Sequence, residues 1–373
     1  MYKRQPYPQY LIHENSRILD PGQAGLAVSV GSIAAGTMVA HSPGTAIAFD
    51  SEPSPFTRTG PGIKGEAKPD LVEFGGNLVT LADSGLVQPN AATNVVMASH
   101  KLSPASAHNH GTSFAAPRVS HKIAVLLQEL QELGFGKVSA PLLKAFLVNS
   151  AQYGVDLDDL QDRFGEVGSK QWLQVLGYGR PNSDRATECD EYSMLLFHQG
   201  KIESDKVAFF DVPIPANLTE STAGKRITVT LAHYPEVQKW GLESYFGTDL
   251  KWRMFRGDVD RGAVLEAMSK DDEVRKEANM ETNSPTELGF EHKVTLRSRG
   301  AVQHDWIDWK THKEEYSKNH YTLAIAASKR WARSQDPIPF AVVVRIEDLG
   351  GTIPIYAEIA SEIDILIEQQ SRV

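Results

Sequence analysis

The sequence has almost no cysteine: Cys189 is the only one among 373 residues, so the chain cannot form a disulfide with itself. This composition fits a reducing compartment, and we expect a cytoplasmic protein. The sequence also lacks any uninterrupted apolar run approaching the roughly 20 residues that a membrane helix needs. The residues after Met1 carry no apolar core of the kind found in a secretory leader. We therefore expect no membrane span and no membrane partner.

Positive charge is scarce as well. The chain has 38 Lys and Arg residues against 47 Asp and Glu residues, which gives a formal net charge of -9. Nucleic-acid binding depends on a basic surface that neutralises phosphates, so nucleic acid is excluded as an expected partner. The imbalance is uneven, because residues 1–185 carry 15 basic against 16 acidic residues and residues 186–373 carry 23 against 31. The excess acidity therefore belongs to the second half.

The first half combines one apolar strand pattern with two helix patterns. Residues 24–34 form a short apolar run of small and β-branched residues, as expected for a strand buried on both faces of a parallel sheet. Residues 45–65 are rich in Pro and Gly and predict a loop. Apolar residues from Val119 onward lie three or four apart and predict a helix that ends near Gly134, followed by a second helix over 140–149. This order predicts an α/β fold.

The second half predicts a β-sandwich. Several segments alternate apolar and polar residues, which indicates strands with one buried and one solvent-exposed face. These segments are 208–215, 226–233, 321–328, 340–349 and 354–359. A charged stretch, 270–279, is expected to be a solvated insertion. We place the division between the two domains at residue 188, with residues 1–188 in the first domain and 189–373 in the second.

The segment HNHGTSFAAP (108–117) sets a polar cluster directly against the predicted helix. Gly111 permits a backbone turn that other residues resist, and Ser113 falls where the helix begins. Unpaired amides and the positive end of the helix dipole favour a developing negative charge there, so the Ser113 N–H can act as an oxyanion donor. Pro117 is expected in the first turn, where proline is tolerated. The same pattern suits a helix N-cap, so a nucleophile and a cap both stay open at Ser113.

Four segments resemble one protein family in the same order. GTSFAAP (111–117) resembles the serine motif of the subtilisin-like serine proteases, the subtilases. GLAVSVGSIA (25–34) resembles the family strand that reads close to "ITVGA", and FTRTGPGIKGEAKPDLVEFGG (56–76) resembles its "FSSRGP...KPDIVAPG" segment. GYGRPN (177–182) resembles the "GYG" that closes the catalytic domain. The resemblance implies a partial subtilisin-like parallel sheet with helices, followed by a β-sandwich-like domain.

The resemblance continues more loosely into the second half. RITVTLAH (226–233), RGAVQHDWI (299–307) and the segment from Phe340 are similar to the β-rich C-terminal extension of a group of bacterial intracellular subtilases. Some members of that group are encoded beside an AAA-type ATPase. The resemblance thus implies a protein or peptide substrate and an AAA-type ATPase as a partner.

The resemblance implies serine endopeptidase chemistry at Ser113. In the family an Asp, a His and an oxyanion Asn precede the serine, and their segments lie upstream of the "ITVGA"-like strand. Only Ser113 therefore carries over, as nucleophile and backbone oxyanion donor, with Gly111, Thr112 and Pro117 as the supporting motif. We expect the chain to be a C-terminal portion of a subtilase, a fragment or one piece of a split protein, with little activity by itself.

Histidines within the chain offer a poor replacement for the family base. His108 and His110 precede Ser113 too closely to approach its hydroxyl from across a cleft, and we expect them to pack and form hydrogen bonds in a loop. His121 is expected on a helix face, and His304 is expected to be structural. A second hypothesis stays open: a non-catalytic interaction protein derived from a subtilase, which binds a partner through its acidic β domain.

No cofactor and no metal are expected. The acidic segment VDLDDLQDRFGE (155–166) lacks the glycine that bends a calcium-binding loop, so it favours an acidic turn or a helix start.

Overall fold

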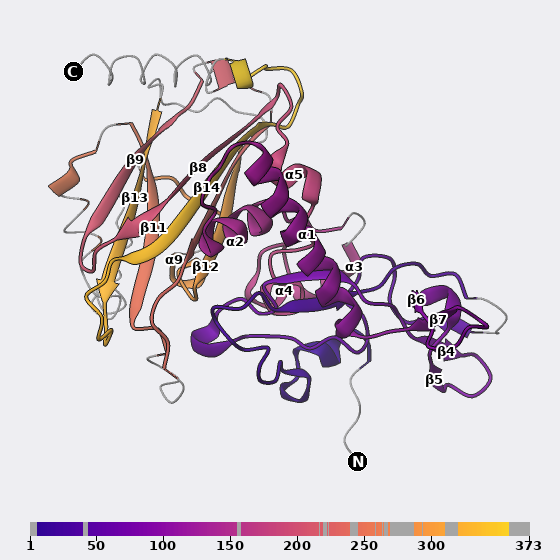
Figure 1. The fold of residues 1–373 in the computed structure, drawn as a ribbon. Coiled ribbons are helices and arrows are strands. Elements are labelled where there is room, and N and C mark those ends of the chain that lie inside the picture. Colours follow the sequence, from indigo (N-terminus) through magenta and orange to yellow (C-terminus); the bar gives the residue numbers. More distant parts are fainter. Residues whose placement is uncertain are drawn as a thin grey trace. The chain divides into compact units, whose positions relative to one another are not determined.

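The computed structural model divides the chain into two compact units (Figure 1). The first comprises Met1–Val138 and Ser150–Ala186, and the second comprises Ser139–Asn149 and Thr187–Val373. The described residues are 6–39, 44–154, 158–215, 217–218, 222, 224–238, 245–257, 259–262, 264, 268, 287–292, 294–309 and 320–357. The predicted insertion at 270–279 lies outside them. None of the described helices is both long and apolar enough to cross a membrane.

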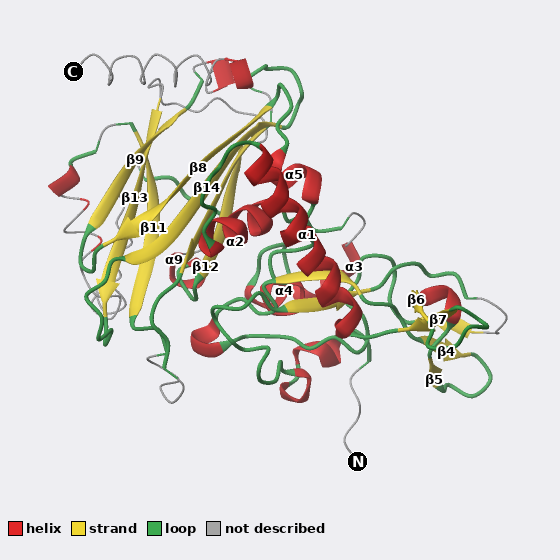
Figure 2. Ribbon diagram, viewed as in Figure 1, coloured by secondary structure: helices red, strands yellow, loops and turns green. Residues whose placement is uncertain are grey.

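A parallel strand pair and one long helix form the centre of the first unit (Figure 2). Strand β1 (Val30–Ile33) pairs with β3 (Leu71–Phe74), with Val30 opposite Leu71 and Ile33 opposite Phe74. Helix α1 (Thr112–Glu132) packs against both strands. Its buried side chains, Ala115, Val119, Leu126 and Leu130, form the predicted apolar stripe, and Gly134 follows in a left-handed conformation.

Strand β1 is shorter than the predicted 24–34 because a buried lysine uses the carbonyl groups ahead of it. The Lys68 ammonium donates to the carbonyl oxygens of Ala24 and Ala27 and to the Asp70 carboxylate, which lies 2.7 Å away. Asp70 in turn accepts from the amide and hydroxyl of Ser29. A fully buried charge needs such partners, so the chain at 24–29 curls around Lys68 instead of extending.

Small ribbons and short helices complete the first unit. Strands β2 (Gly44–Ala46), β4 (Val79–Leu81) and β5 (Val87–Gln88) form one antiparallel sheet. Strands β6 (Val95–Ala98) and β7 (Ser106–Asn109) form a hairpin that leads into α1. The single-turn 3-10 helices are η1 (Gln9–Ile12), η2 (Glu14–Ser16), η3 (Ile63–Gly65) and η4 (Ala91–Thr93). Helices α3 (Asp158–Phe164), α4 (Lys170–Leu176) and α5 (Ser183–Thr187) follow later in the chain.

The acidic segment at 155–166 contributes a helix to the core of this unit. Leu160 and Phe164 of α3 are buried with Trp172 and Leu176 of α4, Leu11 and Ile33. The described part of the segment is therefore the helix start that the sequence favours.

The first unit also leaves several large apolar side chains in solvent. Met38 is 82% exposed, Leu102 is fully exposed, and Val96 and Leu86 are each 64% exposed. Among the described strands, β1 and β3 pair only with one another. Exposed apolar side chains of this kind mark contacts with other protein or a tendency to aggregate.

The second unit is a β-sandwich, as the sequence predicts. One antiparallel sheet has the order β12-β10-β14-β8 and the other the order β11-β13-β9. The strands are β8 (Ser193–Ile202), β9 (Val207–Pro213), β10 (Lys225–His233), β11 (Thr248–Arg256), β12 (Val302–Trp309), β13 (His320–Lys329) and β14 (Ile338–Asp348). Alternate residues from both sheets share one core, among them Val229, Trp252, Leu323 and Val342.

Helix α2 (Ala140–Asn149) belongs to this second unit, because it packs on the other face of the four-stranded sheet. Phe146 of α2 lies 5.1 Å from the Phe197 ring of β8, and the Asn149 amide donates to the Thr230 hydroxyl of β10. Its bounds agree with the prediction. The strand predicted at 354–359 is wrong for its described part, since residues 356–357 are helical. Short α9 (Val294–Arg297) precedes β12.

Candidate active site

Ser113 lies in solvent at the start of α1, in what we call the Ser113 turn, residues 110–114. Gly111 is the N-cap residue, and its φ of 143° is one that side-chain-bearing residues rarely adopt. The Phe114 amide donates to the Gly111 carbonyl oxygen at 3.0 Å, which closes the turn. The Ser113 side chain is exposed, and within the described chain neither its hydroxyl nor its backbone N–H makes a hydrogen bond.

The capping interpretation of Ser113 is wrong, because the N-cap is Gly111 and no side-chain oxygen caps the helix. Thr112 and Ser113 are already the first two helical residues. The unpaired N–H of Ser113 is thus one of the free amides of a helix N-terminus. Such an amide, near the positive end of the helix dipole, is suited to stabilise an oxyanion.

The prediction that Pro117 lies in the first turn is also wrong. Helix α1 begins at Thr112, so Pro117 is inside it. A residue at position 117 would ordinarily donate its amide to the carbonyl of Ser113, four residues earlier, and proline has no amide proton. The Ser113 carbonyl therefore lacks its helical donor, although the helix continues to Glu132.

A backbone contact joins the Ser113 turn to the end of β3. The Gly111 amide donates to the Gly75 carbonyl oxygen at 2.8 Å. A Cβ atom on Gly75 would lie 2.7 Å from the Gly111 carbonyl oxygen and 2.2 Å from the Ser32 hydroxyl oxygen. A Cβ on Gly76, whose φ is 100°, would lie 2.9 Å from the Cβ of His110. The two glycines are therefore what lets the chain before α1 lie directly on the sheet.

The buried hydroxyl groups of Ser54 and Ser32 lie beside the Gly75–Gly76 pair. Ser54 donates to the Gly76 carbonyl oxygen at 2.7 Å, and the hydroxyl oxygens of Ser54 and Ser32 are 2.7 Å apart. Since Ser54 has a single hydroxyl proton, Ser32 must be the donor in the second bond. The Ser32 amide donates to the Thr57 hydroxyl oxygen. The sequence analysis did not identify Ser32 or Ser54, because small polar residues in a strand or in a nearby loop give no distinctive signal.

His110 packs in the Ser113 turn instead of facing the Ser113 hydroxyl. Its ring lies 5.0 Å from the Phe56 ring, and its Nδ1 atom is buried without a hydrogen-bond partner. The Asn94 Oδ1 atom is likewise buried and unpaired, and it would lie 3.5 Å from a Cβ on Gly76. These contacts agree with a packing role for His110.

The other histidines lie elsewhere. His108 is exposed on β7, and His121 is exposed on α1. His304 is buried in the second unit, where its Nδ1 atom lies 2.7 Å from the Thr230 hydroxyl oxygen. Within the described residues, none of these rings forms a hydrogen bond with Ser113. The described chain thus presents the Ser113 hydroxyl and N–H at a helix N-terminus, and no described histidine ring is hydrogen-bonded to that hydroxyl.

A charged trio lies further along α1. The Glu73 carboxylate, 1% exposed, accepts from the Lys122 ammonium and from the Arg180 Nε atom at 2.8 Å. Burial alone raises the pKa of Glu73, but hydrogen bonds from Lys122 and the Phe74 amide, with the charge of Arg180, hold that pKa below its ordinary value. The trio ties α1 to β3 and to the segment after α4.

No metal centre is visible in the described part of the chain. There, no three His, Cys, Asp or Glu side chains gather in a group able to hold a metal ion.

The comparisons with known proteins identify the family of the first unit. The family described as the subtilase family matches residues 10–179, which include the Ser113 turn and both parallel strands. The chain belongs to the subtilase family. As a member of a peptidase family, it is expected to act on protein or peptide substrates.

The relatives add little about its particular role. The uncharacterized protein y4bN of Sinorhizobium fredii (strain NBRC 101917 / NGR234) is 32% identical over 356 residues, which are 91% of this chain and 78% of y4bN. A structure of tomato aspermy virus is 16% identical, covers 44% of this chain and 83% of its own, and has a TM-score of 0.19. A structure of infectious bursal disease virus strain Gx is 14% identical, covers 44% and 34%, and has a TM-score of 0.22. At such TM-scores the viral structures carry no argument.

Proposed function

We propose that this chain is the nucleophile-bearing part of a subtilisin-like serine endopeptidase, with Ser113 as the nucleophile. One observation carries the proposal: Ser113 is exposed at a helix N-terminus, and its hydroxyl and N–H are both unpaired among the described residues. A serine that capped the helix would instead use its hydroxyl oxygen to accept from a backbone amide of the first turn.

In the proposed reaction the Ser113 hydroxyl oxygen attacks the carbonyl carbon of the scissile peptide bond. A base takes the hydroxyl proton and then gives it to the leaving amine as the C–N bond breaks, which leaves an acyl group on Ser113. Water, activated by the same base, then hydrolyses the ester. The Ser113 N–H stabilises the oxyanion of each tetrahedral intermediate.

The base, the aspartate that orients it and the second oxyanion donor come, in this proposal, from a segment with the Asp, His and Asn of the subtilase family. The described chain would then hydrolyse peptides very poorly without that segment, because loss of the base removes most of the chemical acceleration. The proposal locates the complete enzyme in the cytoplasm and allows an AAA-type ATPase as its partner.

Labelling with a fluorophosphonate probe tests the proposal. The probe should modify Ser113, identified by peptide mass spectrometry, when the chain is joined to the Asp-, His- and Asn-bearing segment of a subtilase, and should modify the chain alone only weakly. Ser113→Ala should abolish the labelling. Ser120→Ala is the matched control, because Ser120 is an exposed serine of the same helix whose hydroxyl donates to the Ala116 carbonyl.

Two results would contradict the proposal. Labelling that persists in Ser113→Ala would assign the nucleophile elsewhere. Strong labelling of the chain alone would show that it contains its own base.

A non-catalytic interaction protein is the second candidate, and one observation favours it: no described histidine forms a hydrogen bond with Ser113. In that case the sandwich, which belongs to the acidic second half of the sequence, would bind the partner. A biological assay separates the two candidates. A phenotype that survives Ser113→Ala but is lost when Trp252 of the sandwich core is replaced by alanine would favour binding over proteolysis.

A further inference from the structure

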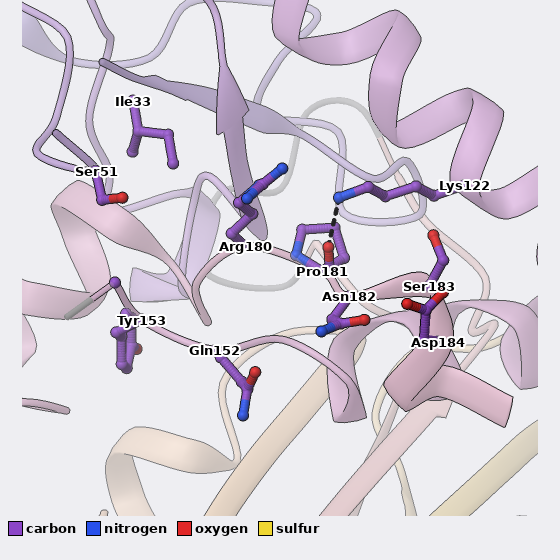
Figure 3. Close-up of a pocket in the computed structure, with 11 residues that line it drawn as sticks. Ile33, Ser51, Lys122, Gln152, Tyr153, Arg180, Pro181, Asn182, Ser183 and Asp184 are labelled. Atoms are coloured by element: carbon purple, nitrogen blue, oxygen red, sulfur yellow. Dashed lines mark hydrogen bonds between the residues drawn. The ribbon is translucent and has the colours of Figure 1, made fainter. Parts of the chain in front are cut away.

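The first unit contains a polar cavity of about 350 Å³ that the proposed proteolysis does not use (Figure 3). Its lining includes Lys122, Gln152, Arg180, Ser183 and Asp184. Lys122 follows Ser113 by nine residues on α1, so the helix rise between them is about 14 Å. The cavity is therefore separate from the Ser113 turn.

Arg180 is held rigidly at this cavity. Its backbone amide donates to the Gln152 carbonyl, and its own carbonyl accepts from the Gln152 amide. Its Nε atom donates to the buried Glu73 carboxylate, and its guanidinium carbon lies 4.1 Å from the centre of the Phe74 ring. A guanidinium fixed in this way loses little conformational entropy when it binds a ligand.

The terminal nitrogens of Arg180 are nevertheless unused. Among the described residues neither of them donates a hydrogen bond, and the side chain is 43% exposed. Lys122 donates to Glu73 and to the Pro181 carbonyl, which leaves one of its three protons without an acceptor. Because the two cations share one carboxylate, the trio of Glu73, Lys122 and Arg180 has a net charge of +1. Figure 3 shows the Arg180 and Lys122 side chains as neighbours in the lining.

Neutral donors line the same cavity. The Ser183 hydroxyl and the Gln152 side-chain amide make no hydrogen bond to the described residues. A planar guanidinium fork beside an ammonium is a donor set that binds carboxylate or phosphate oxygens.

We propose that this cavity is a binding site for a small oxyanion, held by the terminal nitrogens of Arg180 together with Lys122. Carboxylates and phosphates share this chemistry, and binding measurements distinguish them. Asp184, whose exposed side chain also lines the cavity, limits the affinity by like-charge repulsion.

Titration calorimetry with sodium acetate in one arm and inorganic phosphate in the other tests the site, with ionic strength held constant by sodium chloride. At least one oxyanion should bind saturably to the wild-type chain. Arg180→Lys keeps a cation beside Glu73 but removes the fork, so it should weaken binding about tenfold or more. Ser183→Ala should weaken binding less, and Asp184→Asn should strengthen it.

Lys170→Gln is the matched control, because Lys170 is an exposed cation of the same unit that does not line the cavity. It should leave both titrations unchanged, and urea unfolding of each variant should show that the first unit stays folded. Acetate binding alone would assign the site to carboxylates, and phosphate binding alone would assign it to phosphates. Absence of saturable binding, or equal affinity in wild type and Arg180→Lys, would overturn the proposal.

Discussion

Gly75→Ala is expected to disturb the Ser113 turn through simple lack of space. The new Cβ would lie 2.2 Å from the Ser32 hydroxyl oxygen and 2.7 Å from the Gly111 carbonyl oxygen, so at least one of them must move. Overpacking of this kind costs typically 1–3 kcal/mol, and loss of backbone freedom in the unfolded chain returns about 0.4–1 kcal/mol. We expect a net destabilisation of about 1–2 kcal/mol, which for a unit of this size lowers Tm by roughly 2–8 °C.

Urea unfolding and hydrogen exchange measure the two consequences separately. Unfolding reports the loss of stability. Exchange of the Phe114 amide, which donates to the Gly111 carbonyl, reports any displacement of the Ser113 turn and should become faster. Gly136→Ala is the matched control, because a Cβ there meets nothing within 4 Å.

A second substitution separates the two clashes. Ser32→Ala removes the hydroxyl oxygen at 2.2 Å but leaves the Gly111 carbonyl at 2.7 Å. In a double-mutant cycle, Gly75→Ala and Ser32→Ala together should cost less stability than the sum of the two, while Phe114 exchange stays fast. Strictly additive losses of stability in the two single variants, or a Gly75→Ala protein as stable as Gly136→Ala, would refute the steric argument.

Two further predictions concern buried charge. Lys68→Met leaves the Asp70 carboxylate buried without its cation and should cost about 3–5 kcal/mol in urea unfolding, whereas adding Asp70→Asn should restore most of the loss; an equally unstable double variant would contradict this. His233 is buried, and burial lowers its pKa to about 4 from the ordinary 6.5. Because the pKa of folded His233 is depressed, the free energy of unfolding should be greatest above pH 6.5 and should fall by up to roughly 3 kcal/mol as the pH approaches 4. If the reasoning is right, the free energy of unfolding of His233→Gln should fall less over the same pH range.

Local sequence patterns identified α1 and α2 well, whereas α4, α5 and α9 were not predicted. The apolar spacing from Val119 and the glycine at 134 are properties of one segment, so they could be interpreted without the rest of the fold. Strand β11 was missed although its sequence carries the two-residue period: Leu250, Trp252 and Met254 are buried in the sandwich core. By contrast, the early end of β1 depends on Lys68, a tertiary partner that no local pattern reveals.

The candidate site likewise contains residues that a local pattern points to and residues that only the tertiary fold brings together. Ser113 stands in a motif of adjacent residues, and that local motif is what makes it the candidate nucleophile. The support beneath it could not be predicted, because Ser32, Ser54 and Gly76 come together only through the pairing of β1 with β3 and the loop between them. The misplacement of Pro117 has a local cause, since the sequence does not fix at which residue of the GTS motif the helix begins.

The contacts that fix the Ser113 turn all lie within the first unit, and this bears on how a complete enzyme would be assembled. Gly111 is held by Gly75, and Gly76 by Ser54, so these described contacts position the backbone of the Ser113 turn from within the unit. In the proposed function, a segment that brings the base has to place one imidazole within hydrogen-bond reach of a hydroxyl that is already in position. The favourable free energy of assembly would then come mainly from covering exposed apolar side chains such as Met38 and Leu102, which lie in the same unit.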